Sequence, residues 1–227
     1  MKKFSSELAY FLGIALLALG TALIVRADFG VSMVVAPAYL MHLKVSELLP
    51  FFSFGMAEYT FQAMLLVLMC LILRKFRAYY LFSFVTAVVY GFVLDLFTPL
   101  VSLLPAASLF PRIVEFAFGI FFSASAIALL FHSYIPPEVY ELFVKEFSER
   151  FGFDLGRVKI CYDLISCGAA AIMSLVFFGG FRGIGVGTLV TALINGVPIG
   201  KFSKLLEKKF SFEDSTRLRK YLGEKNK

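Results

Sequence analysis

Cysteine and histidine are scarce in this 227-residue chain, and the few that occur form no pattern typical of an enzyme. The three cysteines and two histidines are Cys70, Cys161, Cys167, His42 and His132. The cysteines are odd in number, have no paired spacing and stand in or beside apolar stretches, so we expect neither a disulfide nor a metal site. The glycine-rich stretch 178–188 lacks the lysine that a phosphate-binding loop requires. We therefore expect no catalytic residue, no metal and no cofactor, and the chain is not predicted to be an enzyme.

Charged residues are also few. They make up 17% of the chain, whereas 59% of its residues are hydrophobic and the mean hydropathy is +0.83. Ordinary soluble domains carry about 25% charged residues, so this balance indicates an integral membrane protein. Six apolar runs occur, at 9–25, 56–73, 79–97, 113–131, 160–178 and 184–200. Each is close to the roughly 20 residues that a helix needs to cross a bilayer. The sequence predicts an all-α membrane protein with six transmembrane helices.

Basic residues are unevenly placed around these runs. If the N-terminus is cytoplasmic, eighteen of the 22 Lys and Arg residues fall on the inner side. The outer side keeps Arg26, Lys44, Arg112 and Arg182. This bias follows the positive-inside rule and predicts that both termini are cytoplasmic, in a bacterial inner membrane. It also accounts for the net charge of +6 without a nucleic-acid partner.

The tail 203–227 is predicted to be basic and cytoplasmic. We expect four lysines near its start to bind the anionic inner leaflet: Lys201, Lys204, Lys208 and Lys209. A partner protein is the alternative. Ser211 and Asp214 have the spacing of a capping box, which predicts a short helix from there to about Leu222.

The chain contains a weak internal duplication. Three pairs of segments match in order, at offsets of 106, 101 and 105 residues: 10–24 with 116–130, 52–62 with 153–163, and 85–97 with 190–202. The alternative is that apolar helices rich in glycine and alanine resemble one another by chance. Because each copy holds three spans, the second copy must enter the membrane from the opposite side. The sequence thus predicts two inverted repeats, 1–104 and 105–202, followed by the tail.

Each predicted repeat has an additional segment between its first and second spans. Segment 136–151 places apolar residues such as Val139 and Leu142 on one helical face and charged residues such as Glu138 and Glu141 on the others, which predicts an interfacial helix on the cytoplasmic surface. Segment 30–54 is more apolar and contains two prolines. It is expected to be a re-entrant or broken segment on the outer side, or else to lie at the interface.

Ionisable groups within the spans are the candidate binding residues, because each one is costly in the bilayer. Glu58 and Gln62 are four residues apart on one helical face, and the duplication places Lys159 and Asp163 at the same two positions of the second copy. We expect these four to line a central cavity. The alternative is that Lys159 and Asp163 form a local ion pair and that Glu58 reaches the outer surface.

Three further polar residues are weaker candidates for solute or ion binding: Tyr90, Asp95 and Asn195. Tyr90 and Asn195 match across the duplication. Asp95 is close enough to the outer end of its span to face water. Asn195 is deep in the last span, where an interhelical hydrogen bond is its more usual role.

Several strings resemble the YczE/YitT-like bacterial membrane proteins: RADFGVSM (26–33), FSFGMAEYTFQ (52–62), FDLGRVKICYDL (153–164) and GIGVGTLVTALINGVPI (183–199). The resemblance covers about 10–205 and implies a two-halved membrane fold, with no particular transport substrate. This chain departs from the pattern at two places. VSMVVAPAY lacks the acidic residue usual after the first LG turn, and Pro136-Pro137 replaces the second LG turn.

Two classes of function fit these features. The first is a secondary transporter or permease for a small organic solute. The mixed charges of the four candidates favour a zwitterionic or anionic solute, with Glu58 or Asp163 coupled to protons. The second is a non-transporting membrane component, either a substrate-capture subunit or a scaffold for membrane enzymes. A homodimer is compatible with both.

Overall fold

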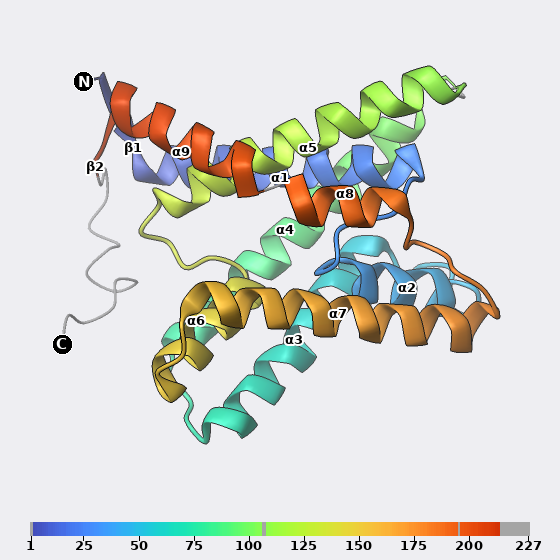
Figure 1. Cartoon of the computed structure of the whole chain (residues 1–227), viewed down its shortest axis with the longest axis horizontal. Coiled ribbons are helices and arrows are strands. Elements are labelled where there is room, and N and C mark those ends of the chain that lie inside the picture. Colours follow the sequence, from blue (N-terminus) through green and yellow to red (C-terminus); the bar gives the residue numbers. More distant parts are fainter. Residues whose placement is uncertain (1, 106–107, 195, 214–227) are drawn as a thin grey trace.

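The apolar runs form long helices in a computed structural model that describes residues 2–105, 108–194 and 196–213. Six helical segments in this part are long and apolar enough to cross a membrane. They are α1 (Ser6–Ala27), α3 (Phe54–Leu73), α4 (Tyr79–Ser102), α5 (Leu109–Phe131), α7 (Leu155–Phe178), and α8 (Val186–Ile194) with α9 (Gly196–Lys209). The predicted fold class, an all-α membrane protein with six spanning helices, is confirmed (Figure 1).

Local signals in the sequence set the helix boundaries. The side chains of Ser5, Ser53 and Asp154 cap the first turns of α1, α3 and α7 by accepting a hydrogen bond from the backbone N–H three residues later. At the other end, α7 stops at Gly179, which has a φ of +67°. Glycine adopts this left-handed conformation without strain, so the chain turns sharply there toward α8.

Two short helices lie between the spans. They are α2 (Ala36–Val45), with 10 residues, and α6 (Val139–Phe151), with 13 residues. At 1.5 Å per residue they measure about 15 and 20 Å, too short to cross a hydrocarbon core of about 30 Å. Helix α2 packs against α3 and α7, and α6 packs against α3, α4 and α7. Segment 30–54 therefore contains a short helix and no single spanning helix. Its placement, re-entrant or at the interface, stays a prediction.

Protein covers part of the polar face of α6 as well as its apolar face. Glu138 and Glu146, which stand among the polar residues of this segment, are each only 6% exposed, whereas Phe151 is 47% exposed. The expectation that Glu138 lies on a water-facing side is therefore wrong. The reason is that α6 contacts three helices at once, so part of its polar face is also in contact with protein.

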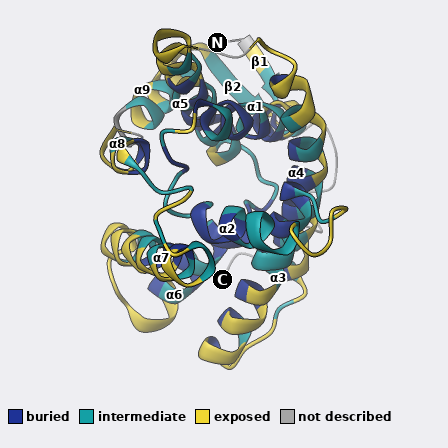
Figure 2. Cartoon of the chain, turned by 90° about the vertical axis from the view of Figure 1, so that its right-hand side faces the viewer, coloured by how far each residue is buried: buried dark blue, intermediate teal, exposed yellow. Residues whose placement is uncertain are grey.

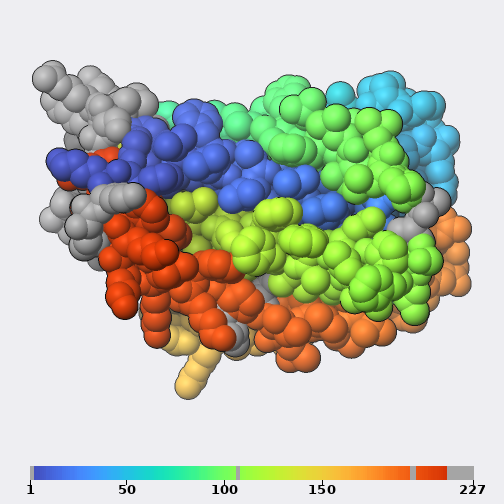
Figure 3. Space-filling model, turned by 90° about the horizontal axis from the view of Figure 1, so that it is seen from above, coloured from blue at the N-terminus to red at the C-terminus, as the bar shows by residue number. Residues whose placement is uncertain are grey.

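The helices form two groups that meet along α4. Figure 2 shows α1, α5, α8 and α9 on one side and α2, α3, α6 and α7 on the other, with α4 on one flank. Helix α1 packs along both α4 and α5, and Figure 3 shows it running between them. Helices α3 and α4 approach closely at Gly55 and Gly91, where a Cβ on Gly55 would lie only 2.0 Å from the carbonyl oxygen of Gly91. The absence of side chains at both positions allows this contact.

The two ends of the described chain lie together at one end of the molecule (Figure 1). Strand β1 (Lys2–Ser5) pairs in parallel with β2 (Phe210–Glu213). Phe4 packs against Phe210 and Phe212, with ring centroids 5.3 and 5.6 Å apart. Ser211 is therefore in a strand, and the prediction that it caps a helix is wrong. The rest of the expected helix lies outside the described residues.

Candidate functional site

Two buried polar residues of α3 meet the start of α6. Glu58 and Gln62 are both 0% exposed and lie one turn apart on the same face. Oε2 of Glu58 accepts a hydrogen bond from the hydroxyl of Tyr140 at 2.9 Å. Oε1 of Gln62 accepts one from the backbone N–H of Val139 at 3.0 Å, and its Nε2 donates to Oε2 of Glu138 at 3.3 Å. We refer to Glu58, Gln62, Glu138 and Tyr140 as the carboxyl cluster.

The sequence around Pro136-Pro137 places Glu138 in this cluster. Proline disrupts the interior of a helix, so α6 begins immediately after the two prolines. Glu138 is the N-cap residue, and its backbone is not helical. The first backbone N–H of α6 has no partner within its own helix. Gln62 of α3 supplies that partner, which ties the start of α6 to the middle of α3.

The two carboxyl groups of the cluster are incompletely paired. Oε1 of Glu58 and Oε1 of Glu138 are buried and have no hydrogen-bond partner. Burial, followed by the charges of Glu141 and Glu58, raises the pKa of Glu138 well above its ordinary value. Burial likewise raises the pKa of Tyr140, so its hydroxyl stays protonated and can donate to Glu58. Buried, incompletely paired carboxyls cost free energy and are more frequent at functional sites than elsewhere.

Helices α1 and α4 add tyrosines to the surroundings of the cluster. Tyr90, 1% exposed, donates to Oγ1 of Thr21 at 3.0 Å, and the charges of Glu58 and Glu138 both act on its hydroxyl. The hydroxyl of Tyr10 lies 2.9 Å from Oγ1 of Thr86. Thr86 in turn donates to the carbonyl of Pro136 at 2.9 Å, which fixes the segment before α6 on α4.

Lys159 and Asp163 lie apart from the carboxyl cluster. Nζ of Lys159 is 3.0 Å from Oδ1 of Asp163, one turn along α7, and 4.0 Å from Oε1 of Glu141. The two side chains are 36% and 30% exposed. This is the local ion pair that the sequence left as an alternative. The four sequence candidates therefore do not form one group in the described structure, and Glu58 does not reach the outer surface.

Asp95 anchors the start of α3. Its Oδ2 accepts from the hydroxyl of Ser53 at 2.5 Å, and its Oδ1 accepts from the backbone N–H of Gly55 at 2.7 Å. A carboxylate is favourable at a helix N-terminus because of the free N–H groups and the helix dipole. Asp95 thus has a structural role between α3 and α4. Asn195, the remaining candidate, lies outside the described residues.

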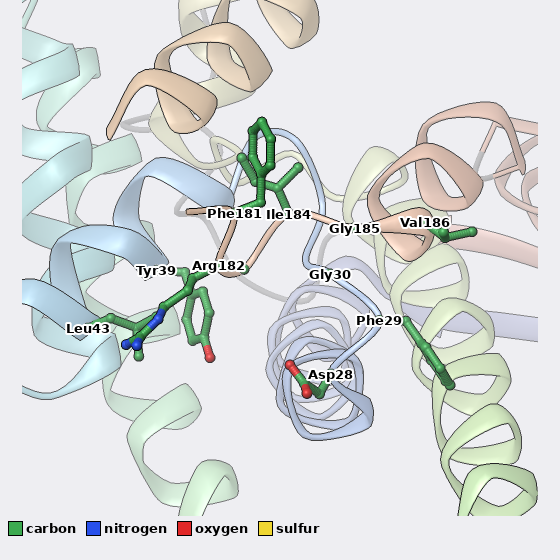
Figure 4. Close-up of a pocket in the computed structure, with 11 residues that line it drawn as sticks. Asp28, Phe29, Gly30, Tyr39, Leu43, Phe181, Arg182, Ile184, Gly185 and Val186 are labelled. Carbon is green, nitrogen blue, oxygen red and sulfur yellow. The ribbon is translucent and has the colours of Figure 1, made fainter. Parts of the chain in front are cut away.

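A pocket of about 600 Å³ opens at the end where α2 and the α7–α8 loop meet. Figure 4 shows Tyr39 and Leu43 of α2 on one side, Asp28 at the end of α1, and the loop with Arg182 and Gly185. The ring of Tyr39 also packs 5.3 Å from the ring of Phe54. Phe54 precedes Glu58 by one helical turn, so this ring contact joins the lining of the pocket to the turn of α3 that comes before Glu58.

Sequence reasoning missed Glu138 and Tyr140. A signal existed, because the offset of 101 residues that relates 52–62 to 153–163 also relates 36–45 to 137–146. It pairs Tyr39 with Tyr140 and Lys44 with Lys145. Extended in this way, the predicted duplication would relate α2 to α6. The burial of Glu138 could still not be read from it, because the position equivalent to Glu138 is a proline.

Comparison with known proteins places the chain in a family. Residues 4–204 match the model of DUF6198, a family of unknown function, and the chain belongs to that family. The match includes the whole carboxyl cluster. No curated protein and no solved structure matches the chain. The family match does not name the YczE/YitT-like proteins, so that relationship stays a prediction from the sequence strings.

Proposed function

We propose that this protein is a secondary transporter or permease for a small solute, with the carboxyl cluster as its central binding site. One observation carries the proposal: two buried carboxyl groups, Glu58 from the first half of the chain and Glu138 from the second, share a hydrogen-bonded cluster in which each has an oxygen without a partner. A protein that only stabilises a membrane assembly gains little from such groups, because apolar side chains would fill the space at lower cost.

The packing of α1 on α5 supports the inverted repeat that this proposal requires. A Cβ on Gly20 would meet the carbonyl of Gly119 at 2.8 Å, and a Cβ on Gly13 would meet the carbonyl of Ala126 at 3.3 Å. The offset of 106 residues converts Gly13 to Gly119 and Gly20 to Ala126, so it exchanges the two contacts. A pseudo-twofold axis between α1 and α5 would produce this exchange.

The arrangement of the two helix groups supports a rocking motion. Helix α4 joins them on one flank through its contacts with α3 and α6. On the other flank no extensive contact joins α7 to α8 or α9 within residues 155–194 and 196–209. Movement of one group against the other around α4 would alter access to the carboxyl cluster, as alternating access requires.

The cluster favours a cation over the anionic or zwitterionic solute first expected. That expectation depended on Lys159 sharing a cavity with Glu58, and Lys159 is paired with Asp163 instead. The ionisable groups of the cluster itself are two carboxyls and one phenol. Groups of this kind attract positive charge and repel anions.

The proposed orientation has the β1–β2 end in the cytoplasm of a bacterial cell. Six crossings would put both described ends on the same side of the membrane, and the pairing of β1 with β2 is consistent with this. Lys201, Lys204, Lys208 and Lys209 of α9 are at that end, where anionic lipid headgroups would bind them. This matches the positive-inside distribution of the sequence.

Purified protein in proteoliposomes on a solid-supported membrane tests the proposal. A panel of organic cations, zwitterions and anions is applied, and charge movement is recorded for the natural chain, for Glu58→Gln and for Asp163→Asn. We expect currents with at least one cation, loss of these currents in Glu58→Gln, and their retention in Asp163→Asn. Absence of current and of isotope uptake for every solute, together with stable co-purification of an ATPase, would favour a substrate-capture subunit instead.

A further inference from the structure

The carboxyl cluster brings two acids together without a base. Gln62, one turn from Glu58 on α3, donates to Glu138, and the charge of Glu58 acts on Glu138. Two negative charges so close in a buried site repel each other strongly, because little solvent screens them. A single proton on either carboxyl would remove that repulsion.

The groups that face this pair do not compensate the charge. Among the described residues, five titratable side chains act on Glu58 or Glu138 or are acted on by them, and all five are acids: Tyr10, Tyr90, Tyr140, Glu141 and Tyr162. They come from α1, α4, α6 and α7, so they surround the pair. One ion pair with a cation lies one step further out, where Nζ of Lys159 is 4.0 Å from Oε1 of Glu141.

The hydrogen bonds leave a position for a proton on each acid. Oε2 of Glu58 accepts from Tyr140, and Oε2 of Glu138 accepts from Gln62. The opposite oxygen of each carboxyl is buried and has no partner. A proton on that oxygen would leave both existing hydrogen bonds intact. A metal ion is less suited to the site, since no group of three metal-ligating side chains occurs in the described part of the chain.

We propose that Glu58 and Glu138 form a proton-binding site that holds one exchangeable proton, which would make the proton the coupling ion of the proposed transporter. Coupling rests on the proposed function, but proton binding does not. Release of the proton would leave two negative charges at the contact between α3 and the start of α6, and the repulsion between them would oppose that contact. Proton exchange is thereby linked to the position of α6.

Infrared difference spectroscopy of the purified protein in lipid measures this proton directly. A protonated carboxyl has a C=O absorption that a carboxylate lacks and that shifts in heavy water. We expect the folded natural chain to show this absorption at neutral pH and to lose it on alkaline titration. Glu58→Gln and Glu138→Gln should each alter the absorption, and the double variant should lack it. Glu149→Gln, which changes an exposed acid on α6, should retain it.

Two results would overturn the inference: a folded natural chain without the absorption at neutral pH, or an absorption that persists unchanged in the double variant. If a glutamine variant fails to fold, the alkaline titration and the isotope shift of the natural chain still decide the matter. The test is independent of transport. An absorption that depends on Glu58 and Glu138 in a protein that moves no solute would refute the proposed transport function and leave the proton site standing.

Discussion

Gly91 is the position at which the contact between α3 and α4 can be tested most directly. A Cβ at Gly91 would lie 2.7 Å from the carbonyl oxygen of Gly55 and 2.9 Å from Cδ1 of Tyr59. The first distance is 0.7 Å short of the 3.4 Å at which ordinary contact begins. Because the carbonyl belongs to the backbone of α3, the two helices must separate to admit a methyl group. Overpacking of this kind costs about 1–3 kcal/mol.

Gly168 provides a matched control for Gly91→Ala. It lies within α7, as Gly91 lies within α4, and a Cβ there would meet nothing within 4 Å. Replacing a mid-helix glycine by alanine favours the helix by roughly 0.5–1 kcal/mol at either site, so this contribution cancels in the comparison. The remaining difference between the two variants is the steric cost at the α3–α4 contact.

Unfolding of both variants by sodium dodecyl sulfate in mixed micelles, followed by far-ultraviolet circular dichroism, measures the difference. We expect Gly168→Ala to unfold at the same or a higher detergent fraction than the natural chain. Gly91→Ala should be less stable than Gly168→Ala by about 1–3 kcal/mol. Equal stability of the two variants would show that α3 and α4 do not meet at Gly91, and the position of Glu58 beside α4 would then be in error.

Two further predictions concern pH and orientation. The pKa of Glu138 is raised in the folded state, so the folded protein binds a proton at Glu138 more tightly than the unfolded chain does. The free energy of unfolding should therefore be highest near pH 4 and should fall as the pH rises. For one proton, the fall is at most about 1.4 kcal/mol per pH unit. Unfolding titrations should show a shallower fall in Glu138→Gln and an unchanged fall in Glu149→Gln, which changes an exposed acid of α6. A steeper fall in Glu138→Gln would contradict this. Single cysteines in place of Arg74 and Arg182, in a background without the native cysteines, should react with impermeant maleimide from opposite sides of the membrane; labelling of both from one side would refute the orientation.

The sequence predicts the spanning helices well because their signal is local. Length and hydropathy of each run decide whether it can cross a bilayer, and these do not depend on neighbouring helices. The pairing of Glu58 with Gln62 on one face is local for the same reason, since residues four apart lie one turn apart on a helix. Both features could be read from the amino-acid order alone.

The surroundings of these helices are not local and were predicted less well. Tyr80 donates to Glu146 at 2.5 Å, and Arg77 donates to the same carboxylate at 3.3 Å, from positions more than 60 residues away. These contacts satisfy a polar group that the amphipathic pattern assigns to water. Similarly, the capping-box spacing at Ser211 is a local signal, but pairing with β1 at the other end of the chain prevails. In both places a tertiary contact outweighs a local pattern.

The proposed inverted repeat relates the short helices α2 and α6, yet these two helices make different polar contacts. Tyr140 of α6 donates to Glu58 of α3, and the offset of 101 residues converts that pair to Tyr39 and Lys159. The equivalent contact is not made: the ring of Tyr39 packs on Phe54, and Lys159 is paired with Asp163. In a transporter with inverted repeats, the opposite-facing state exchanges the conformations of the two halves.

In that opposite-facing state Tyr39 should therefore approach Lys159, while Tyr140 leaves Glu58. A chain with cysteines at positions 39 and 159, and no others, measures the approach through cross-linking by a short bifunctional reagent. Cross-linking should be rare in the resting protein and should increase when solute is supplied to proteoliposomes. A cysteine pair at 58 and 140 should respond in the opposite direction. If both pairs cross-link equally with and without solute, the two halves do not exchange conformations, and the asymmetry between α2 and α6 is a fixed property of the fold.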